Sequence, residues 1–449
     1  MDETLPPHVT LGTDRAQASH GLYIWTVIIL FGLANAVAFM DRGFLNLVVE
    51  PLRLSLGLSD IQIGLLIGPA FILFYGLAAL PIGRLADAAP RKGVLIAGVL
   101  FWSLCVSLTG WSRRYWQLGA SRMGLGVGEA TLNPAAISII SDLVPRRSLS
   151  AAVAVFVAIG ALGAGLGSLL GGLLLGWLHA RGPLVADGLA PWRQAFVIMG
   201  LPGILLAGLI LVIVREPRRT GQANGARGFR WAQTLAYLRV NRAGTLSVIF
   251  GFALISLLPT LAAWIPAFLS RTFGWTPARI GPALGLAQIL TNPTGIIIGG
   301  LLADCLRRRG REDANLRVIV TCLAAALPFF ILFPLMPTAQ LALCAYAPAN
   351  LFTMICLGAS TPAVPLLVPA GMRSQGIAVM FLAGNLMGAL GPLLPPLLTQ
   401  YVFHGREALR LALMIVPGIA CPLSALILLR ARPAFLAQVI SLKGESRLC

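Results

Sequence analysis

Charged residues are scarce in this sequence of 449 residues, and acidic ones are scarcest. Asp, Glu, Lys and Arg make up 11% of the chain, whereas hydrophobic residues make up 57%. A soluble protein needs more polar residues to cover its surface, so this composition predicts several membrane-spanning segments. The net charge of +18 does not indicate nucleic-acid binding, because the basic residues lie in short clusters between hydrophobic runs.

The residues that usually build metal sites and active sites are also few. The 4 histidines lie far apart and the 7 cysteines occur singly, so we expect no metal site and no histidine-based catalytic group. The sequence contains no nucleotide-binding loop and no recognisable set of nucleophile and base. We therefore expect no catalytic residues and no cofactor, which argues against an enzyme or an ATP-driven pump. The first 20 residues do not resemble a signal peptide, so the first hydrophobic segment is expected to remain as a span.

Long hydrophobic runs are abundant, and each reaches the roughly 17–25 residues needed to cross a bilayer. The longest polar interruption, REPRRTGQANGARGFR, separates six such runs from six more. We therefore predict an all-α membrane protein with a tail (1–21), a six-helix bundle (22–214), a central loop (215–244), a second six-helix bundle (245–430) and a second tail (431–449). The predicted helices cover 22–49, 61–83, 93–112, 116–140, 149–178, 193–214, 245–270, 279–303, 316–336, 340–365, 374–402 and 408–430.

Lys and Arg are distributed unequally between the two predicted sides of the membrane. The side with both tails and the central loop carries 23 of the 34, the other side carries nine, and Arg42 and Arg122 fall within the membrane. Because basic residues are enriched on the cytoplasmic side, both termini are expected to face the cytoplasm.

The two halves of the sequence repeat a short loop motif. GRLADAAPRK places Gly83, Asp87 and Arg91 four residues apart, and GLLADCLRRR repeats that spacing with Gly300, Asp304 and Arg308. LVPRRSLSAAVAV (143–155) and LVPAGMRSQGIAV (367–379) form a second pair. Parallel six-helix repeats of this kind place a substrate site near the bilayer midplane, where the two bundles meet.

The first bundle holds four charged residues within predicted spans. Arg122 and Glu129 are seven residues apart on one helix, so they share a face, roughly 9 Å and 20 Å from its outer end. Asp41 and Arg42 lie roughly 11–12 Å deep on the first helix, so Arg42 could reach Glu129. Two acids and two bases form a neutral set that can exist in a low dielectric. These groups either pin two helices together or serve transport, and buried charges that face a cavity usually serve transport.

The second bundle is different, because its predicted helices contain no Asp or Glu. Proton coupling, if present, must therefore depend on the first bundle, with Asp41 as the first candidate and Glu129 as the second. Protonation of either acid would free Arg42 or Arg122 to bind a phosphate or carboxylate. The other candidate substrate-binding residues are Asn133, Trp264, Asn350 and Asn385.

The twelve spans and the paired loop motif resemble the major facilitator superfamily of secondary transporters, over almost the whole chain. That resemblance implies two bundles related by pseudo-twofold symmetry. It also implies that Asp87, Arg91, Asp304 and Arg308 act as gate elements, although the same loops could merely set topology. MDR (40–42), RMGLGVGEA (122–130), SDLVPRR (141–147) and WRQAFVIMGLPG (192–203) further resemble the Spinster branch, whose members move lysophospholipids or sphingosine-1-phosphate.

The resemblance implies a proton-coupled transporter of amphipathic anionic lipids that works by alternating access. An organic anion symporter, or an exporter of drugs or hydrophobic compounds, from the same superfamily is the alternative. The expected partners are an amphipathic lipid or organic anion, protons and membrane lipids, without nucleic acid. A monomer in the bacterial inner membrane is expected.

Overall fold

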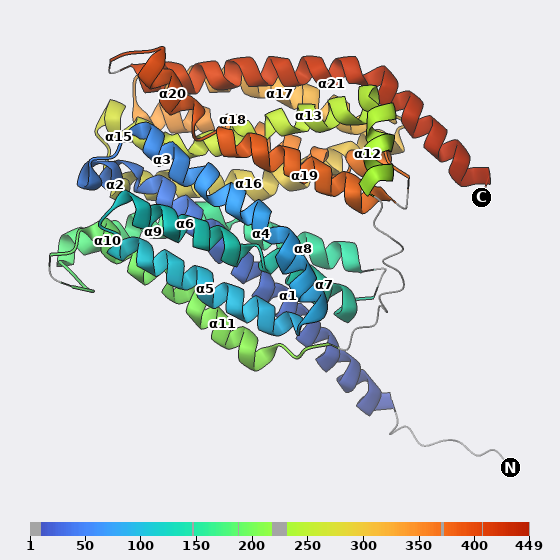
Figure 1. The fold of residues 1–449 in the computed structure, drawn as a ribbon, viewed down its shortest axis with the longest axis horizontal. Coiled ribbons are helices and arrows are strands. Elements are labelled where there is room, and N and C mark those ends of the chain that lie inside the picture. The colour runs from blue at the N-terminus through green and yellow to red at the C-terminus, as the bar shows by residue number, and fades with distance from the viewer. Residues whose placement is uncertain are drawn as a thin grey trace.

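The computed structural model describes residues 10–145, 148–186, 188–217, 231–369, 372–405 and 407–448. Helices dominate these residues, and they form two bundles that lie side by side (Figure 1). We call α1–α11 the N-half and α13–α21 the C-half. The start of α1 (Thr10–Leu47) and the end of α21 (Ala408–Leu448) lie at one end of the molecule, together with α7 (Leu132–Leu143) and α12 (Trp231–Val240) (Figure 1). The helices α2 (Val49–Leu56) and α15 (Ile265–Phe273) lie at the opposite end. We call these ends the terminal face and the distal face.

The N-half begins with a helix that runs past the membrane span. Its helices are α1 (Thr10–Leu47), α2 (Val49–Leu56), α3 (Asp60–Ile67), α4 (Pro69–Ala88), α5 (Arg91–Trp111), α6 (Tyr115–Glu129), α7 (Leu132–Leu143), α8 (Leu149–Ala161), α9 (Gly163–Arg181), α10 (Pro191–Met199) and α11 (Leu201–Ile213).

The C-half follows a short helix in the predicted central loop. The helix in the loop is α12 (Trp231–Val240). The helices of the C-half are α13 (Ser247–Ile255), α14 (Leu257–Thr260), α15 (Ile265–Phe273), α16 (Pro277–Arg308), α17 (Ala314–Leu332), α18 (Ala339–Ser360), α19 (Arg373–Leu390), α20 (Leu394–Tyr401) and α21 (Ala408–Leu448). The predicted tail after residue 430 continues α21 as a helix, because Phe435 and Val439 are buried against the bundle.

Within the described residues, eleven helical segments are long and apolar enough to span a membrane. The remaining predicted span, 116–140, is present as two shorter helices, α6 and α7, which are interrupted just after Glu129. Other spans are divided in the same way, for example at Gly68 between α3 and α4 and at Gly200 between α10 and α11. The structure therefore confirms an all-helical membrane protein, and the fourth predicted helix is present as α6 and α7 with a two-residue turn between them.

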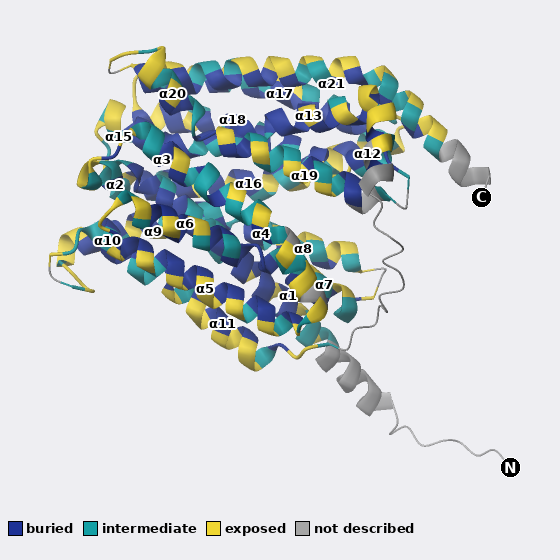
Figure 2. Ribbon diagram, viewed as in Figure 1, coloured by how far each residue is buried: buried dark blue, intermediate teal, exposed yellow. Residues whose placement is uncertain are grey.

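Exposed residues lie along the outer sides of the bundles (Figure 2), and many of them are large hydrophobic residues. Leu77, Leu211 and Leu301 are examples, each more than half exposed. Such side chains are expected where the surrounding solvent is lipid rather than water. The interior is closely packed and includes fully buried aromatic residues from both halves.

The two halves pack most closely where α9 meets α16. Small residues make this approach possible: a methyl group added to Gly165 would lie 2.7 Å from the backbone nitrogen of Ile289. At this contact Ser168 donates a hydrogen bond to Gln288 across 3.3 Å. From there the helices of the two halves diverge toward the terminal face (Figure 1).

Candidate functional site and gates

Four charged side chains of the N-half come together inside the membrane-spanning region. Asp41 and Arg42 come from α1, and Arg122 and Glu129 come from α6. The Arg42 guanidinium donates a hydrogen bond to the Glu129 carboxylate, which confirms that Arg42 reaches that helix. Residues seven apart on α6 project from the same side, so both α6 charges face α1.

These charges are buried but incompletely paired. Asp41, Arg122 and Glu129 are at most 3% exposed. One carboxylate oxygen of each acid and one terminal nitrogen of Arg122 have no hydrogen-bond partner within the described part of the chain. An unpaired buried polar atom is costly, so such atoms in a native site usually await a proton, a water or a ligand.

Aromatic rings occupy part of the space around the two arginines. The Arg42 guanidinium lies 4.6 Å from the ring centre of Phe39 and 4.4 Å from that of Phe71. Arg122 lies 5.7 Å from the ring centre of Phe196. Ring faces stabilise a cation that has lost water. The Arg42 side chain is nevertheless 33% exposed, so it is the member of the set that a solute can reach.

The predicted substrate-binding residues lie in several different places. Asn133 of α7 donates a hydrogen bond to the Tyr75 hydroxyl of α4, at 3.2 Å, on the N-half side. Asn385 is half-buried on α19. Trp264 is fully buried and donates from its indole nitrogen to the backbone oxygen of Pro392, at 2.8 Å. In this conformation Trp264 is therefore a packing residue near the distal face.

Asn350 belongs to a buried network of neutral side chains in the C-half. Its amide nitrogen donates to Thr291 at 2.7 Å and to Asn292 at 2.8 Å. Tyr346 donates to its carbonyl oxygen across 3.4 Å. This network joins α16 to α18 at the depth where Gln288 meets the N-half.

The predicted gate residues have unlike environments in the two halves. Arg91 is buried and binds Asp142 at 2.5 Å and Glu216 at 3.0 Å, so it joins α5 to α7 and to the segment after α11. Arg308 is exposed, and Asp304 is 3.7 Å from Arg307 on the same helix. The side chain of Asp87 lies outside the described residues.

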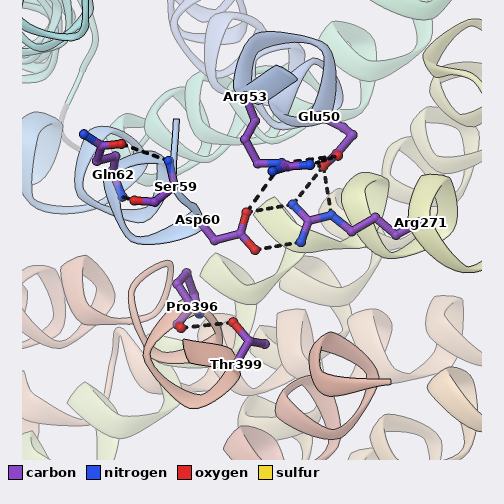
Figure 3. A network of polar contacts seen from close by, with 8 residues as sticks. All are labelled: Glu50, Arg53, Ser59, Asp60, Gln62, Arg271, Pro396 and Thr399. Carbon is purple, nitrogen blue, oxygen red and sulfur yellow. Dashed lines mark hydrogen bonds and ion pairs between the residues drawn. The ribbon is translucent and has the colours of Figure 1, made fainter. Parts of the chain in front are cut away.

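A charged cluster at the distal face was missed from the sequence. Arg271 of α15 places its two terminal nitrogens 2.7 Å from the two carboxylate oxygens of Asp60, and its Nε lies 2.8 Å from Glu50 (Figure 3). Arg53 lies 2.6 Å from Glu50 and 3.7 Å from Asp60. We call these four residues the distal tie, because they join α2 and α3 of the N-half to α15 of the C-half.

Local sequence explains how two members of the distal tie are positioned. Ser59 and Gln62 form a capping box that starts α3 and sets Asp60 in its first turn. Burial raises the pKa of Glu50, but hydrogen bonds and charges from Arg53 and Arg271 outweigh it and hold that pKa below its ordinary value. The spacing of Glu50 and Arg53 could have indicated a local pair, whereas nothing in the sequence linked either to Arg271.

Comparisons with known proteins agree with this architecture. The family model "Major Facilitator Superfamily" matches residues 31–439. An "MFS-type efflux pump" of Mycolicibacterium smegmatis is 29% identical, over 91% of this chain and 93% of its own length. The sphingosine-1-phosphate transporter SPNS2 of Danio rerio is 27% identical, over 68% of this chain and 61% of its own length.

A solved structure shows the same fold at lower sequence identity. A bacterial homologue of the human lysosomal transporter Spinster, inward-facing and unoccupied, matches with a TM-score of 0.75 and 22% identity. The match covers 94% of this chain and 98% of that one. The chain therefore belongs to the Major Facilitator Superfamily and is a secondary transporter rather than an enzyme.

Proposed function

We propose that this transporter moves amphipathic anions of the lysophospholipid or sphingoid-phosphate class, coupled to protons, by alternating access. The observation that carries the proposal is the buried set of Asp41, Arg42, Arg122 and Glu129, whose arginine at position 42 remains reachable. A buried charge set is costly in a membrane and is usually retained for function.

The Glu129 carboxylate and the substrate anion would compete for the same arginine, Arg42. While Glu129 is ionised, it holds the Arg42 guanidinium. Protonation of Glu129 removes that negative charge and frees a planar donor that fits a phosphate or carboxylate. Asp41, which has an unpaired oxygen beside these groups, is the other proton acceptor and would act through Arg122. Substrate release would then be linked to return of the carboxylate to its arginine.

The C-half suits the remainder of an amphipathic molecule. Its predicted helices contain no acid, and the buried network around Asn350 consists of neutral amides and hydroxyls. An anionic head group would therefore be drawn to the N-half, while an alkyl tail would lie along apolar side chains of the C-half. Similarity to SPNS2 and to the Spinster homologue supports this substrate class.

The distal tie would act as a gate on one side of this site. It joins the halves at the distal face, while the helices diverge toward the terminal face (Figures 1 and 3). The excess of basic residues near the terminal face supports placing that face in the cytoplasm. The conformation then has its outward side closed, and Arg91, Asp304 and Arg308 would change partners when the other side closes. A monomer in the bacterial inner membrane remains our expectation.

The test is transport by purified protein in liposomes, with and without an imposed pH gradient. We expect labelled lysophospholipid flux to depend on the gradient, and both Asp41→Asn and Glu129→Gln to abolish that dependence. Glu407→Gln serves as the matched control, because Glu407 is an exposed acid that pairs locally with Arg410. Gradient-dependent flux that survives in both variants would contradict the proton-coupling assignment.

A second candidate is an exporter of hydrophobic compounds, which the similarity to the efflux pump of Mycolicibacterium smegmatis favours. The same liposomes distinguish the two functions when a small organic anion and a hydrophobic dye are offered in place of the lipid. Flux of the dye without flux of the lysophospholipid would assign the protein to export.

A further inference from the structure

A groove on the outside of the C-half has basic residues at one end and apolar walls along the rest. It lies between α17 and α21 and has a volume of about 370 Å³. Its apolar walls come from Leu306 of α16, Leu316 and Val320 of α17, and Leu428 and Leu429 of α21. The groove is thus separate from the charges of α1 and α6.

The basic end consists of two arginines held by one carboxylate. Arg317 Nε lies 2.8 Å from Asp313, and Arg432 Nε lies 2.5 Å from the same side chain. Burial raises the pKa of Asp313, but the hydrogen bonds and charges of both arginines outweigh it and hold that pKa below its ordinary value. The carboxylate therefore stays ionised near neutral pH, and the three groups together carry one net positive charge.

The terminal nitrogens of both arginines remain available to a ligand. Each guanidinium uses Nε for Asp313, and its terminal nitrogens have no hydrogen-bond partner in the ranges that the structure describes. The two side chains are 39% and 40% exposed and both line the groove. Two oriented guanidinium forks at one site match the oxygens of a phosphate group.

The basic end and the apolar walls of the groove lie at the membrane depths of a lipid phosphate and its acyl chain. The apolar span of α17 begins at Ala314, so Asp313 and its arginines lie at the boundary of the hydrocarbon region. Thr321, at the deeper end of the groove, is about 10 Å further along the helix. A phosphate at the arginines would therefore place an acyl chain along Val320 and Leu429.

We propose that this groove binds an anionic phospholipid of the surrounding bilayer, with its phosphate on Arg317 and Arg432 and one acyl chain between α17 and α21. Charge complementarity favours this occupant over a zwitterionic lipid, because the site has a net positive charge next to a membrane surface. The bound lipid would bridge two helices that Asp313 already joins. It would be a structural ligand of the C-half rather than the transported molecule.

The experiment measures binding of phosphatidylglycerol and phosphatidylcholine to the full-length protein in detergent by native mass spectrometry. We expect wild type to retain phosphatidylglycerol selectively, and Arg317→Gln/Arg432→Gln to bind it at least about tenfold more weakly. Arg308→Gln/Arg309→Gln is the matched control, since it removes the same charge from exposed residues of the same face. Equal losses in the two double variants would overturn the site in favour of general surface charge.

A second pair of variants tests whether the apolar part of the groove binds the acyl chain, without changing any charge. Thr321→Trp fills the groove while leaving the contacts of Asp313 intact. Leu332→Trp places the same bulk on α17, at an exposed position outside the groove. We expect only Thr321→Trp to weaken phosphatidylglycerol binding. Unchanged binding in Thr321→Trp would refute the groove as the binding site, whatever the arginine variants show.

Discussion

The two copies of the loop motif have the same spacing but opposite roles in the structure. Arg91 of the N-half is buried and contacts two acids, Asp142 and Glu216. Arg308, at the equivalent position of the C-half, is exposed. In the C-half the acid that gathers arginines is Asp313, five residues further on, which holds Arg317 and Arg432. A repeated motif thus specifies where a charge lies along the helix, whereas its partners come from segments that are not repeated.

The membrane-spanning interiors of the two halves also differ in charge. The N-half buries Asp41, Arg122 and Glu129, while the C-half buries a neutral network around Asn350. Charges respond to protonation and neutral amides do not. The difference indicates one half that can carry proton coupling and one half that supplies shape and neutral hydrogen bonds.

The largest expected effect is a difference in stability between variants of the two motif copies. Arg91→Gln leaves two acids without their shared partner in a poorly solvated place, and breaking such a buried pair costs about 3 kcal/mol of stability. Arg308→Gln changes an exposed residue and should alter stability by less than about 0.5 kcal/mol. Thermal unfolding in detergent measures both. Similar shifts in the two variants would mean that the motif copies are equivalent after all.

The next effect concerns the place where the halves meet at the distal face. Arg271→Gln removes the bonds to Glu50 and Asp60, and a partly exposed ion-pair network of this kind contributes about 1 kcal/mol. The population open at the distal face should then rise roughly fivefold. Electron–electron distance measurements between spin labels at Leu54→Cys and Thr276→Cys, in a background without native cysteines, would report it.

Arg279→Gln is the matched control, because Arg279 is exposed and stacks 4.1 Å over Trp275 within the C-half.

The pKa of Glu50 is depressed in the folded protein. The stability that ionised Glu50 contributes to the distal tie is therefore present above the ordinary pKa of 4.5 and is lost only as pH falls through the lower folded value. The distance distribution of the labelled protein with Arg271 intact should therefore stay unchanged from about pH 8 to about pH 5. A shift toward the open distance within that range would count against Glu50 as a structural anion of the tie.

The smallest effect belongs to the neutral network of the C-half. Asn350→Ala removes two short hydrogen bonds, to Thr291 and Asn292, and a long one from Tyr346; bonds of this kind within membranes average about 0.6 kcal/mol each, so a loss of about 1 kcal/mol or slightly more is expected. Asn385→Ala, at a half-buried position, should leave thermal stability nearly unchanged. Proton dependence of transport should persist in Asn350→Ala. Its disappearance would show that coupling also requires the C-half.

Much of the fold could be predicted from the sequence, because membrane spans depend on long apolar runs. The contact between Arg42 and Glu129 could also be predicted, since helix geometry converts sequence position into depth. The interruption after Glu129 was not predicted, although Gly128 precedes it and Pro134, which has no N–H to bond the carbonyl oxygen of Ala130, follows it. The partners of Arg91 were missed because they lie on other segments of the chain.

The sequence by itself determined the membrane class, the two repeated halves and the absence of acidic residues from the predicted helices of the second half. These properties follow from composition and periodicity, which each segment carries locally. Only the tertiary structure decided that Arg271 meets Glu50 and Asp60, and that Asp313 orients two arginines beside a groove. In each case at least one partner lies more than a hundred positions away in the sequence. Such contacts depend on how the helices pack and not on any local sequence pattern.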